Sequence, residues 1–179
     1  IGMRQKHFNF ITRIFSTGED RVQTNVLPIV TACREMAETK TGALIVIGQR
    51  SDLTLIAEGG IAIDAKVSTP LLKNIFFKNA PLHDGAVLVE GDRVVAAKCI
   101  LPVTQSDVPK SYGTRHRAAI GMSEISDAII VVVSEETGGI SIAQGGSLRR
   151  DVDPAGLQKT LQRYLTINTR KRTKNEVAE

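Results

Sequence analysis

The sequence predicts a single α/β domain in which a central mixed β-sheet is flanked by helices. A chain of 179 residues can bury one well-packed core and leaves little room for two domains. Short, continuous apolar runs of the kind found in doubly buried strands alternate with segments of helical periodicity. The composition, 42% hydrophobic and 23% charged, is typical of globular proteins.

The chain begins with a segment, residues 1–19, that we expect to be an amphipathic N-terminal linker. Three of the five phenylalanines lie here among basic residues, which is typical of an interfacial or packing helix. From Asp20 to Ala37, apolar residues recur at helical spacing, and Gly42 marks the stop. Pro28 interrupts this helix and predicts either a kink or a late start.

The next segments predict two strands and a helix. Residues 43–48 are a short apolar run and predict a strand buried on both faces. Residues 53–57 are predicted to form a neighbouring strand, after which Gly59-Gly60 breaks the chain. The sequence 68–70, Ser-Thr-Pro, predicts a helix start because a hydroxyl can cap the helix and proline is tolerated in its first turn.

The middle of the chain reads as a hairpin, a loop and a short helix. Residues 86–90 and 93–101 are predicted strands joined by a tight turn at Gly91-Asp92. Residues 102–113 are polar and show no periodicity, so we expect a loop. A short helix is predicted across 117–123.

The last third predicts two more strands and a helix. Residues 128–134 are the most apolar strand candidate, and 140–143 form a further short strand. Asp153-Pro154 opens the last helix. The basic residues 167–179 are expected to be a disordered tail, which leaves 20–166 as the folded domain.

The net charge of +4 is concentrated at the two ends of the chain. Arg4, Lys6 and Arg13 come before any acidic residue, and the tail 167–179 carries a further positive excess. The stretch between them is close to neutral, so a polyanion-binding face is not indicated and we expect no nucleic-acid partner. Basic ends are typical of solvated termini, and also of a terminus that rests on an anionic membrane.

The two cysteines, Cys33 and Cys99, lie within apolar stretches. Neither belongs to a CxxC pair or has the spacing of a metal ligand. We expect reduced core thiols, as is usual for a cytosolic protein.

A first polar turn, residues 81–86, comes just before a predicted strand. Asp84 is followed by Gly85 and Ala86, which leaves the backbone unshielded and open to a phosphate or a ribose. An Asp-Gly pair is also common in ordinary turns.

A second polar turn, residues 113–119, carries Arg115, His116 and Arg117 beside a predicted helix N-terminus. Free N–H groups at a helix start and the fork-shaped donors of arginine suit phosphate oxygens. A solvated basic cluster is the alternative, and a DNA-reading helix is a weaker one.

A third polar turn, residues 134–139, follows the most apolar strand and holds Glu135 and Glu136. Paired carboxylates at a strand end can hold a divalent ion that is shared with phosphates. A solvated acidic turn is the alternative.

The three turns together provide an acid, a cationic phosphate clamp and acidic metal ligands. Phosphoryl or nucleotidyl transfer requires this combination, because charge on the phosphate must be neutralised and the reactants aligned. The chain contains neither GxxxxGK[ST] nor GxGxxG, so nucleotide binding of those standard forms is not supported.

These turns resemble the signatures of the diadenylate cyclase family. PLHDGAV at 81–87, GTRHRAA at 113–119 and SEETGG at 134–139 occur in the family's order and at about its spacing. The likeness runs from about Asp20 to Leu165 and is greatest to the CdaA type, whose catalytic domain normally follows an N-terminal membrane region. The resemblance implies a cytoplasmic catalytic domain that such a region, missing from this chain, would anchor to the bacterial cell membrane.

The resemblance also implies the reaction, which is that of a nucleotidyltransferase. Two ATP molecules are joined into cyclic di-AMP, a second messenger, and two pyrophosphates are released. Each subunit of a homodimer holds one ATP, and the 3′-hydroxyl of each attacks the α-phosphate of the other across a face-to-face contact. A divalent metal ion assists, with Mn²⁺ or Mg²⁺ expected and Co²⁺ as a further option.

The family's motifs, carried onto this chain, divide the site into three groups. An acid aligns or deprotonates the 3′-hydroxyl, a cationic group holds the triphosphate, and the acidic turn contacts phosphates or the ion. The expected catalytic residues are Asp84, Arg115, His116 and Arg117, the ATP-binding residues are Gly85, Ala86, Ile100, Leu101, Thr114, Ser134 and Glu135, and the metal ligands are His83, Asp84 and Glu136.

One position departs from the family pattern. Relatives of the CdaA type often have an aromatic residue before the leucine where adenine packs, and this chain has Ile100 before Leu101. Adenine would then make aliphatic contacts in place of a ring stack, which puts affinity or base selectivity in question.

Two other functions compete with the cyclase. One is a degenerate regulatory module that binds nucleotide without turnover. The other is a DNA-binding protein that uses the helix at Arg115–Arg117.

Overall fold

The computed structural model describes residues 24–176, with side chains as far as Leu165. The helices are α2 (Val26–Glu38), α3 (Thr54–Glu58), α4 (Thr69–Phe76), α5 (Thr114–Ile125) and α6 (Pro154–Glu176). The strands are β1 (Ala43–Ile47), β2 (Ile61–Lys66), β3 (Ala86–Glu90), β4 (Arg93–Cys99), β5 (Ile129–Val133), β6 (Ile140–Gln144) and β7 (Ser147–Arg149).

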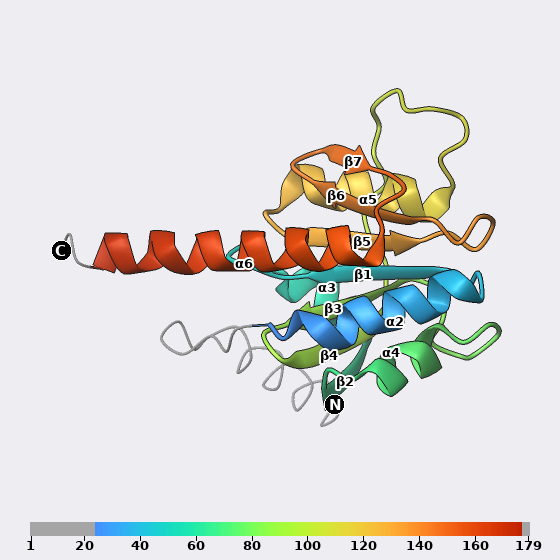
Figure 1. Ribbon diagram of the computed structural model, residues 1–179, viewed down its shortest axis with the longest axis horizontal. Helices are drawn as coiled ribbons and strands as arrows, with labels where there is room; N and C mark the ends of the chain where they lie inside the picture. The colour runs from blue at the N-terminus through green and yellow to red at the C-terminus, as the bar shows by residue number, and fades with distance from the viewer. Residues whose placement is uncertain (1–23, 177–179) are drawn as a thin grey trace, which may run out of the picture.

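The strands form one sheet in the order β2-β4-β3-β1-β5-β6-β7 (Figure 1). Only β1 and β3 are parallel neighbours, and every other pair in the described sheet is antiparallel. Helices cover both faces. The predicted class, a mixed sheet flanked by helices in an α/β domain, is confirmed.

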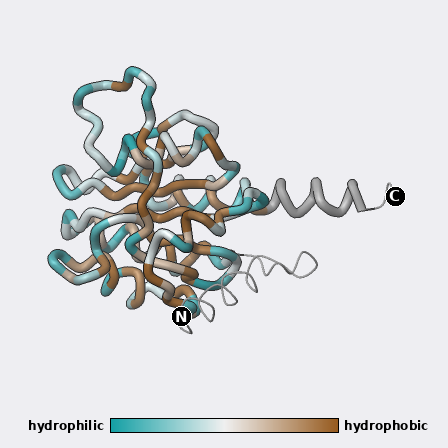
Figure 2. The backbone as a smooth tube through the Cα atoms, turned by 180° about the vertical axis from the view of Figure 1, so that it is seen from behind, coloured by the Kyte–Doolittle hydropathy of each residue, from teal (hydrophilic) through white to brown (hydrophobic). Residues whose placement is uncertain are grey.

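The core has two layers, one on each face of the sheet. Alternate residues of β1 point to opposite faces, so that Ile45 and Ile47 belong to one apolar cluster and Leu44 and Val46 to the other. Helices α2, α4 and α6 pack over the first face, and α3 and α5 over the second. Because both faces are covered, the central strands β1 and β5 are apolar throughout, and Figure 2 shows polar residues mainly in the outer loops.

Helix α2 has the late start that Pro28 allowed. It begins at Val26, and the side chain of Asn25 caps it by accepting a hydrogen bond from the backbone N–H of Leu27 at 3.2 Å. A cap of this kind contributes about 1 kcal/mol. Pro28 lies in the first turn, where a backbone N–H has no partner within the helix, so the missing donor costs nothing.

The prediction of a strand at 53–57 is wrong, because these residues belong to α3. The carboxylate of Asp52 accepts a hydrogen bond from the N–H of Thr54 at 2.9 Å and starts the helix. Leu53 and Ala57, four residues apart, are buried on one side, while Leu55 is 82% exposed. A turn this short has too few residues to distinguish a helical period from a strand period.

Two strands were not predicted, β2 and β7, and both lie at the edges of the sheet. Each has intermediate or exposed residues throughout, so neither carries the apolar run of a central strand. Edge strands lack this pattern because only one side of them is paired and covered.

Two helices are longer than predicted. Helix α5 begins at Thr114, so the Arg-His-Arg sequence lies in its first two turns. Helix α6 continues to Glu176, into the segment for which a disordered tail was expected, and extends beyond the body of the domain (Figure 1). The amphipathic segment expected at 1–19 lies outside the described residues.

Within residues 24–176, no helix has both the length and the apolar character needed to cross a bilayer.

Both cysteine thiols are buried, and burial raises the pKa of Cys33 and of Cys99 to about 12. Because the thiolate is the reactive form, we expect neither to react with iodoacetamide in the folded protein at about pH 8. Mass spectrometry should find two modified cysteines only after denaturation in urea. Rapid alkylation of the native protein would contradict the buried positions.

Candidate active site

Several of the predicted residues line an open pocket of about 810 Å³ on the α3–α5 face of the sheet. Because β1 and β3 are parallel, they begin at the same end of the sheet. Antiparallel pairing makes β4 and β5 end there, with Cys99 opposite Ala86 and Val133 opposite Ala43. The three predicted turns are attached to these strand ends, or to the start of α5 beside them, and therefore meet.

The pocket brings together residues from all three turns. Those predicted from the sequence that line it are His83, Asp84, Gly85, Ile100, Leu101, Thr114, Arg115 and Glu135. Those predicted that do not line it are Ala86, His116, Arg117, Ser134 and Glu136.

Gly85 forms part of the pocket wall, and its lack of a side chain has a structural cause. Its φ is +98°, and a Cβ atom there would lie 2.8 Å from the carbonyl oxygen of Cys99. The close approach of β4 therefore requires glycine at this position. Asp84 is exposed at the head of β3, while Ala86 is fully buried beneath it.

His83, beside Asp84, has a defined proton position. Its Nδ1 lies 2.7 Å from the carbonyl oxygen of Ala80, and because a carbonyl can only accept, Nδ1–H is the donor. The other nitrogen, Nε2, is then able to act as a lone-pair donor. Metal-binding histidines are commonly oriented in this way, by a hydrogen bond from the second ring nitrogen to a backbone carbonyl.

The start of α5 offers backbone donors to the pocket. Gly113, at the N-cap, provides no side-chain cap, and the first backbone N–H bonded within the turn is that of Arg117, which donates to Gly113. The earlier N–H groups of the helix are the usual anion-binding donors. Thr114 and Arg115 of this turn line the pocket.

Arg115 makes an ion pair across the pocket. Its Nη1 lies 3.2 Å from Oε2 of Glu135, with the arginine side chain 21% exposed and the glutamate 62% exposed. The pair therefore joins the start of α5 to the acidic turn that follows β5. Exposed pairs of this kind contribute little to stability, so its importance is geometric.

Arg117 has a different position from Arg115. Its Nε donates to the carbonyl oxygen of Tyr112 at 3.1 Å, and its own carbonyl accepts from the N–H of Thr104 at 3.1 Å. Both bonds hold the 102–113 loop against α5. Arg117 thus fixes the loop beside the pocket without lining the pocket itself.

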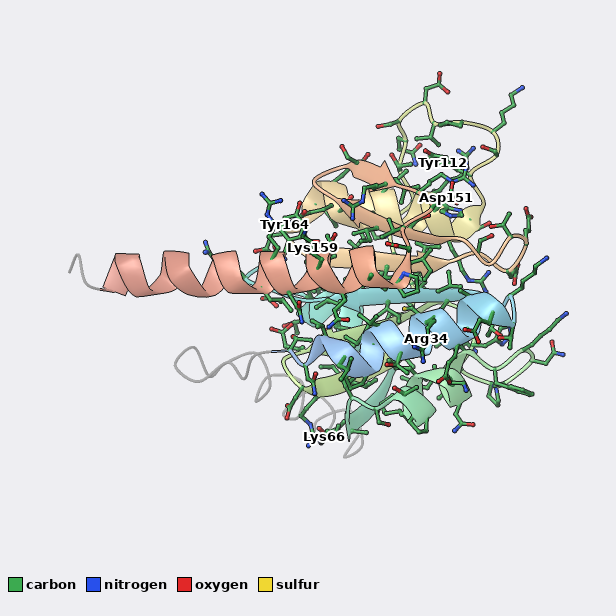
Figure 3. All side chains as sticks on the ribbon, viewed as in Figure 1. Arg34, Lys66, Tyr112, Asp151, Lys159 and Tyr164 are labelled. Atoms are coloured by element: carbon green, nitrogen blue, oxygen red, sulfur yellow. The ribbon has the colours of Figure 1, made fainter. Side chains whose placement is uncertain are left out.

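His116 is buried, 6% exposed, beneath an aromatic and cationic stack. Its ring centroid lies 5.8 Å from that of Tyr112, and Cζ of Arg150 lies 5.3 Å from the centre of the Tyr112 ring. Figure 3 shows Tyr112 of the loop at the same end of the molecule as Asp151, which precedes α6.

Burial is the main cause of a lowered pKa at His116. The positive charge of Arg150 lowers the pKa further, and that of Arg115 adds a smaller decrease. Glu136 and Asp151 act in the opposite direction. The net effect favours a neutral imidazole.

The acidic turn is shaped by Ser134. Its Oγ accepts hydrogen bonds from the N–H groups of Glu136 at 3.2 Å and Thr137 at 3.3 Å. Gly138 has φ +74°, and a Cβ there would collide with the carbonyl oxygen of Ala37 at the end of α2. Glu135 is the carboxylate of this turn that lines the pocket, and the charge of Glu136 acts on His116.

Several pocket residues were missed from the sequence. The most important for chemistry is Lys98, an exposed lysine with φ +54° that adds a second cationic side chain to the pocket beside Arg115. Ile61, Ile100 and Val103 form an exposed apolar rim, at 51%, 80% and 45% exposure. Lys98 lies two residues before Ile100, so its place at the end of a strand that reaches the site was the available signal.

The predicted metal ligands do not form a ready cage. Among residues 24–176, no group of three or more His, Cys, Asp or Glu side chains is arranged to hold an ion. His83 and Asp84 adjoin each other in the pocket, and Glu136 lies outside it. Two protein ligands suit an ion such as Mg²⁺, which usually completes its shell with substrate phosphates and water.

Comparison with known proteins identifies the family. Residues 30–148 match the DAC family model, described as DisA bacterial checkpoint controller nucleotide-binding. The chain belongs to this family. The resemblance inferred from the three turns is thereby confirmed.

Named relatives agree with this assignment. Cyclic di-AMP synthase CdaA of Bacillus subtilis is 41% identical over 167 residues, which is 93% of this chain and 61% of the relative. Diadenylate cyclase of Listeria monocytogenes is 43% identical over 165 residues, 92% of this chain and 60% of the relative. The chain thus spans about three-fifths of the length of these relatives.

Solved structures share the fold. A crystal structure of a double mutant of DacA from Staphylococcus aureus matches with a TM-score of 0.75 and 37% identity, covering 92% of this chain and 99% of that one. A hypothetical membrane spanning protein from Bacillus cereus matches with a TM-score of 0.69 and 47% identity, covering 72% of this chain and 64% of that one.

The lowered pKa of His116 predicts a pH-dependent stability. Below its ordinary value of 6.5 the unfolded chain binds more protons at this site than the folded one, so the free energy of unfolding falls as pH decreases. Urea unfolding at about pH 7.5 and pH 5.5 should show a smaller loss of stability in His116→Gln than in the parent protein. Equal losses in the two proteins would contradict a buried, neutral His116.

Proposed function

We propose that this chain is the catalytic domain of a diadenylate cyclase, which joins two ATP molecules into cyclic di-AMP and releases two pyrophosphates. The observation that carries the proposal is the pocket itself. The pocket brings together the carboxylate of Asp84, the cationic side chains of Arg115 and Lys98, and the free backbone N–H groups at the start of α5. Nucleotidyl transfer needs these groups around one phosphate.

The pocket has one apolar and one charged side, which suits a nucleotide. Leu44 and Leu101 are buried in its floor, and Ile100 stands at its rim. Adenine would lie against these aliphatic side chains, and the triphosphate would point to the start of α5. Ile100, 80% exposed in the isolated chain, is available to cover a base by aliphatic contact.

The chemistry then follows from the positions of the charged groups. Asp84 would orient the 3′-hydroxyl and accept its proton as the oxygen forms a bond to the α-phosphorus of the second ATP. The bond from that phosphorus to the bridging oxygen breaks, and pyrophosphate leaves. Arg115 and the α5 N–H groups would stabilise the charge that develops on the phosphoryl oxygens.

The remaining predicted residues would act through others. His116 and Arg117 would fix the first turns of α5 and the 102–113 loop, since neither lines the pocket. Ser134 would shape the turn that presents Glu135. Ala86 would pack beneath Gly85, which forms the wall against which the nucleotide lies.

A divalent ion fits the donors present. We propose Asp84 and Nε2 of His83 as its ligands, with Glu136 outside the set unless the acidic turn moves. Mn²⁺ or Mg²⁺ is the expected ion, with Co²⁺ as a further option; it would neutralise phosphate charge and lower the pKa of the attacking hydroxyl.

Catalysis would require a homodimer. The pocket holds the groups that bind one nucleotide, while the reaction needs the hydroxyl of one and the α-phosphate of another. Two copies that meet face to face would supply both, and the exposed apolar rim of Ile61, Ile100 and Val103 is suited to such a contact. We further propose that membrane attachment would come from a region outside this chain, because a similar protein from Bacillus cereus is named as a hypothetical membrane spanning protein.

A DNA-reading role for α5 is not favoured. Arg117 is occupied with the carbonyl of Tyr112, and Arg115 points into the pocket, where it pairs with Glu135. Neither guanidinium presents the free, solvent-facing surface that a groove-binding helix requires.

Asp84→Asn tests the proposed acid. The amide keeps the shape of the side chain but cannot accept the proton, so formation of cyclic di-AMP should fall by roughly 10²-fold or more. Mass spectrometry of the product from ATP with Mn²⁺ or Mg²⁺ measures this, and calorimetry should find ATP binding largely retained. Undiminished synthesis would remove Asp84 from its role, and absence of product from the parent protein, despite ATP binding, would establish a regulatory module.

The dimer can be tested by mixing. Because ring closure needs both halves, excess Asp84→Asn protein added to the parent protein should lower its cyclic di-AMP output by forming mixed dimers. Specific activity of the parent alone should rise with protein concentration if the dimer is weak. The matched control is an Asp84→Asn/Ile61→Asp variant, which carries a charge on the rim and should not inhibit. No inhibition by Asp84→Asn, together with constant specific activity, would contradict exchange between such dimers.

A further inference from the structure

Gly42, at the junction between α2 and β1, lies against the side chain of Arg115. A Cβ atom on Gly42 would be 2.7 Å from Cζ, 2.8 Å from Nη1 and 3.0 Å from Nη2 of Arg115. Since Cζ is the nearest and both Nη atoms are almost as close, the guanidinium rests on the glycine with its flat side. No other side chain can occupy this position while the guanidinium stays where it is.

Backbone conformation does not explain this glycine. Gly42 is absent from the glycines of positive φ, which are Gly85, Gly91, Gly138, Gly145 and Gly146. An alanine at 42 is therefore allowed by the backbone, and its methyl group would meet only the far end of a flexible side chain. The guanidinium of Arg115 occupies the space that a side chain at position 42 would fill.

A second contact fixes the guanidinium at Nη1. Ala43 pairs with Val133, so the residues just beyond them, Gly42 and the turn carrying Glu135, lie next to each other. Glu135 forms the 3.2 Å ion pair with Nη1 of Arg115. Arg115 is thus in contact with a bare backbone position just before β1 and with a carboxylate just after the neighbouring strand, β5.

We propose that Gly42 is a positioning residue for the reaction, because the absence of its side chain determines where the Arg115 guanidinium meets the transferring phosphate. This inference rests on the proposed function. Gly42 need not contact the nucleotide itself, since it does not line the pocket. Its effect passes through Arg115 alone.

The test is a double-mutant cycle of Gly42→Ala and Arg115→Ala, with synthesis of cyclic di-AMP and binding of a non-hydrolysable ATP analogue as the readouts. A displacement of about 1 Å at a phosphate-binding group costs up to about 100-fold. Gly42→Ala should therefore lower kcat/KM by roughly 10- to 100-fold while the thermal midpoint stays close to that of the parent. In the Arg115→Ala background, Gly42→Ala should have no further effect, because the group it displaces is gone.

A matched control is Thr41→Ala, at the same junction. The Oγ1 of Thr41 bonds to that of Thr39, and both line a separate recess on the α2–α4 side, away from Arg115. This variant changes the junction without reaching the guanidinium and should keep the parent's kcat/KM.

The outcomes separate the inference from the proposed function. Absence of cyclic di-AMP from the parent protein would contradict the proposed function. Full synthesis by Arg115→Ala would leave the proposed function standing, remove Arg115 from the reaction and overturn the inference. Impaired Arg115→Ala with a fully active Gly42→Ala would overturn only the inference, as would losses that multiply in the double variant. If Gly42→Ala fails to fold, removal of the guanidinium in the double variant should restore folding, and failure to do so would also overturn the inference.

Discussion

Strands β1 and β5 are buried on both faces and pair antiparallel from Ala43 opposite Val133 to Ile47 opposite Ile129. Because β1 also pairs parallel with β3, both of these strands begin at the end of the sheet where β5 finishes. The pocket lies at this end of the sheet. Apolar burial at the centre of the sheet therefore fixes the relative positions of turns that are separated by tens of residues in the chain.

The groups at this end of the sheet carry charges of both signs. Asp84 and Glu135 are exposed carboxylates, and Arg115 of α5 and Lys98 of β4 are cations that line the same pocket. Outside the pocket lining, the buried His116 lies near Tyr112, and Arg117 ties the 102–113 loop to α5. Charged groups that line the pocket are thus supported by groups that hold its shape, which is the division that preorganised sites require.

Sequence patterns predicted the central strands and the long helices because buried elements carry strong periodicity. They failed for α3, read as a strand at 53–57, and for the edge strands β2 and β7, where few residues are buried. The three polar turns were recognised from their residue types and from a family resemblance. Lys98 was missed, since a lone lysine at a strand end is indistinguishable from a surface residue until the fold brings the strand end to the pocket.

The sequence by itself determined the class of fold, the family and the set of turns that carry charge, because these depend on local residue type and spacing. Only the tertiary structure decided which of those residues share a pocket. It separated Arg115, which faces the pocket, from Arg117, which faces a carbonyl, although they are two positions apart on one helix. It also placed Gly42 against the guanidinium of Arg115, 73 positions away in the chain, because this close packing depends on strand pairing across the sheet.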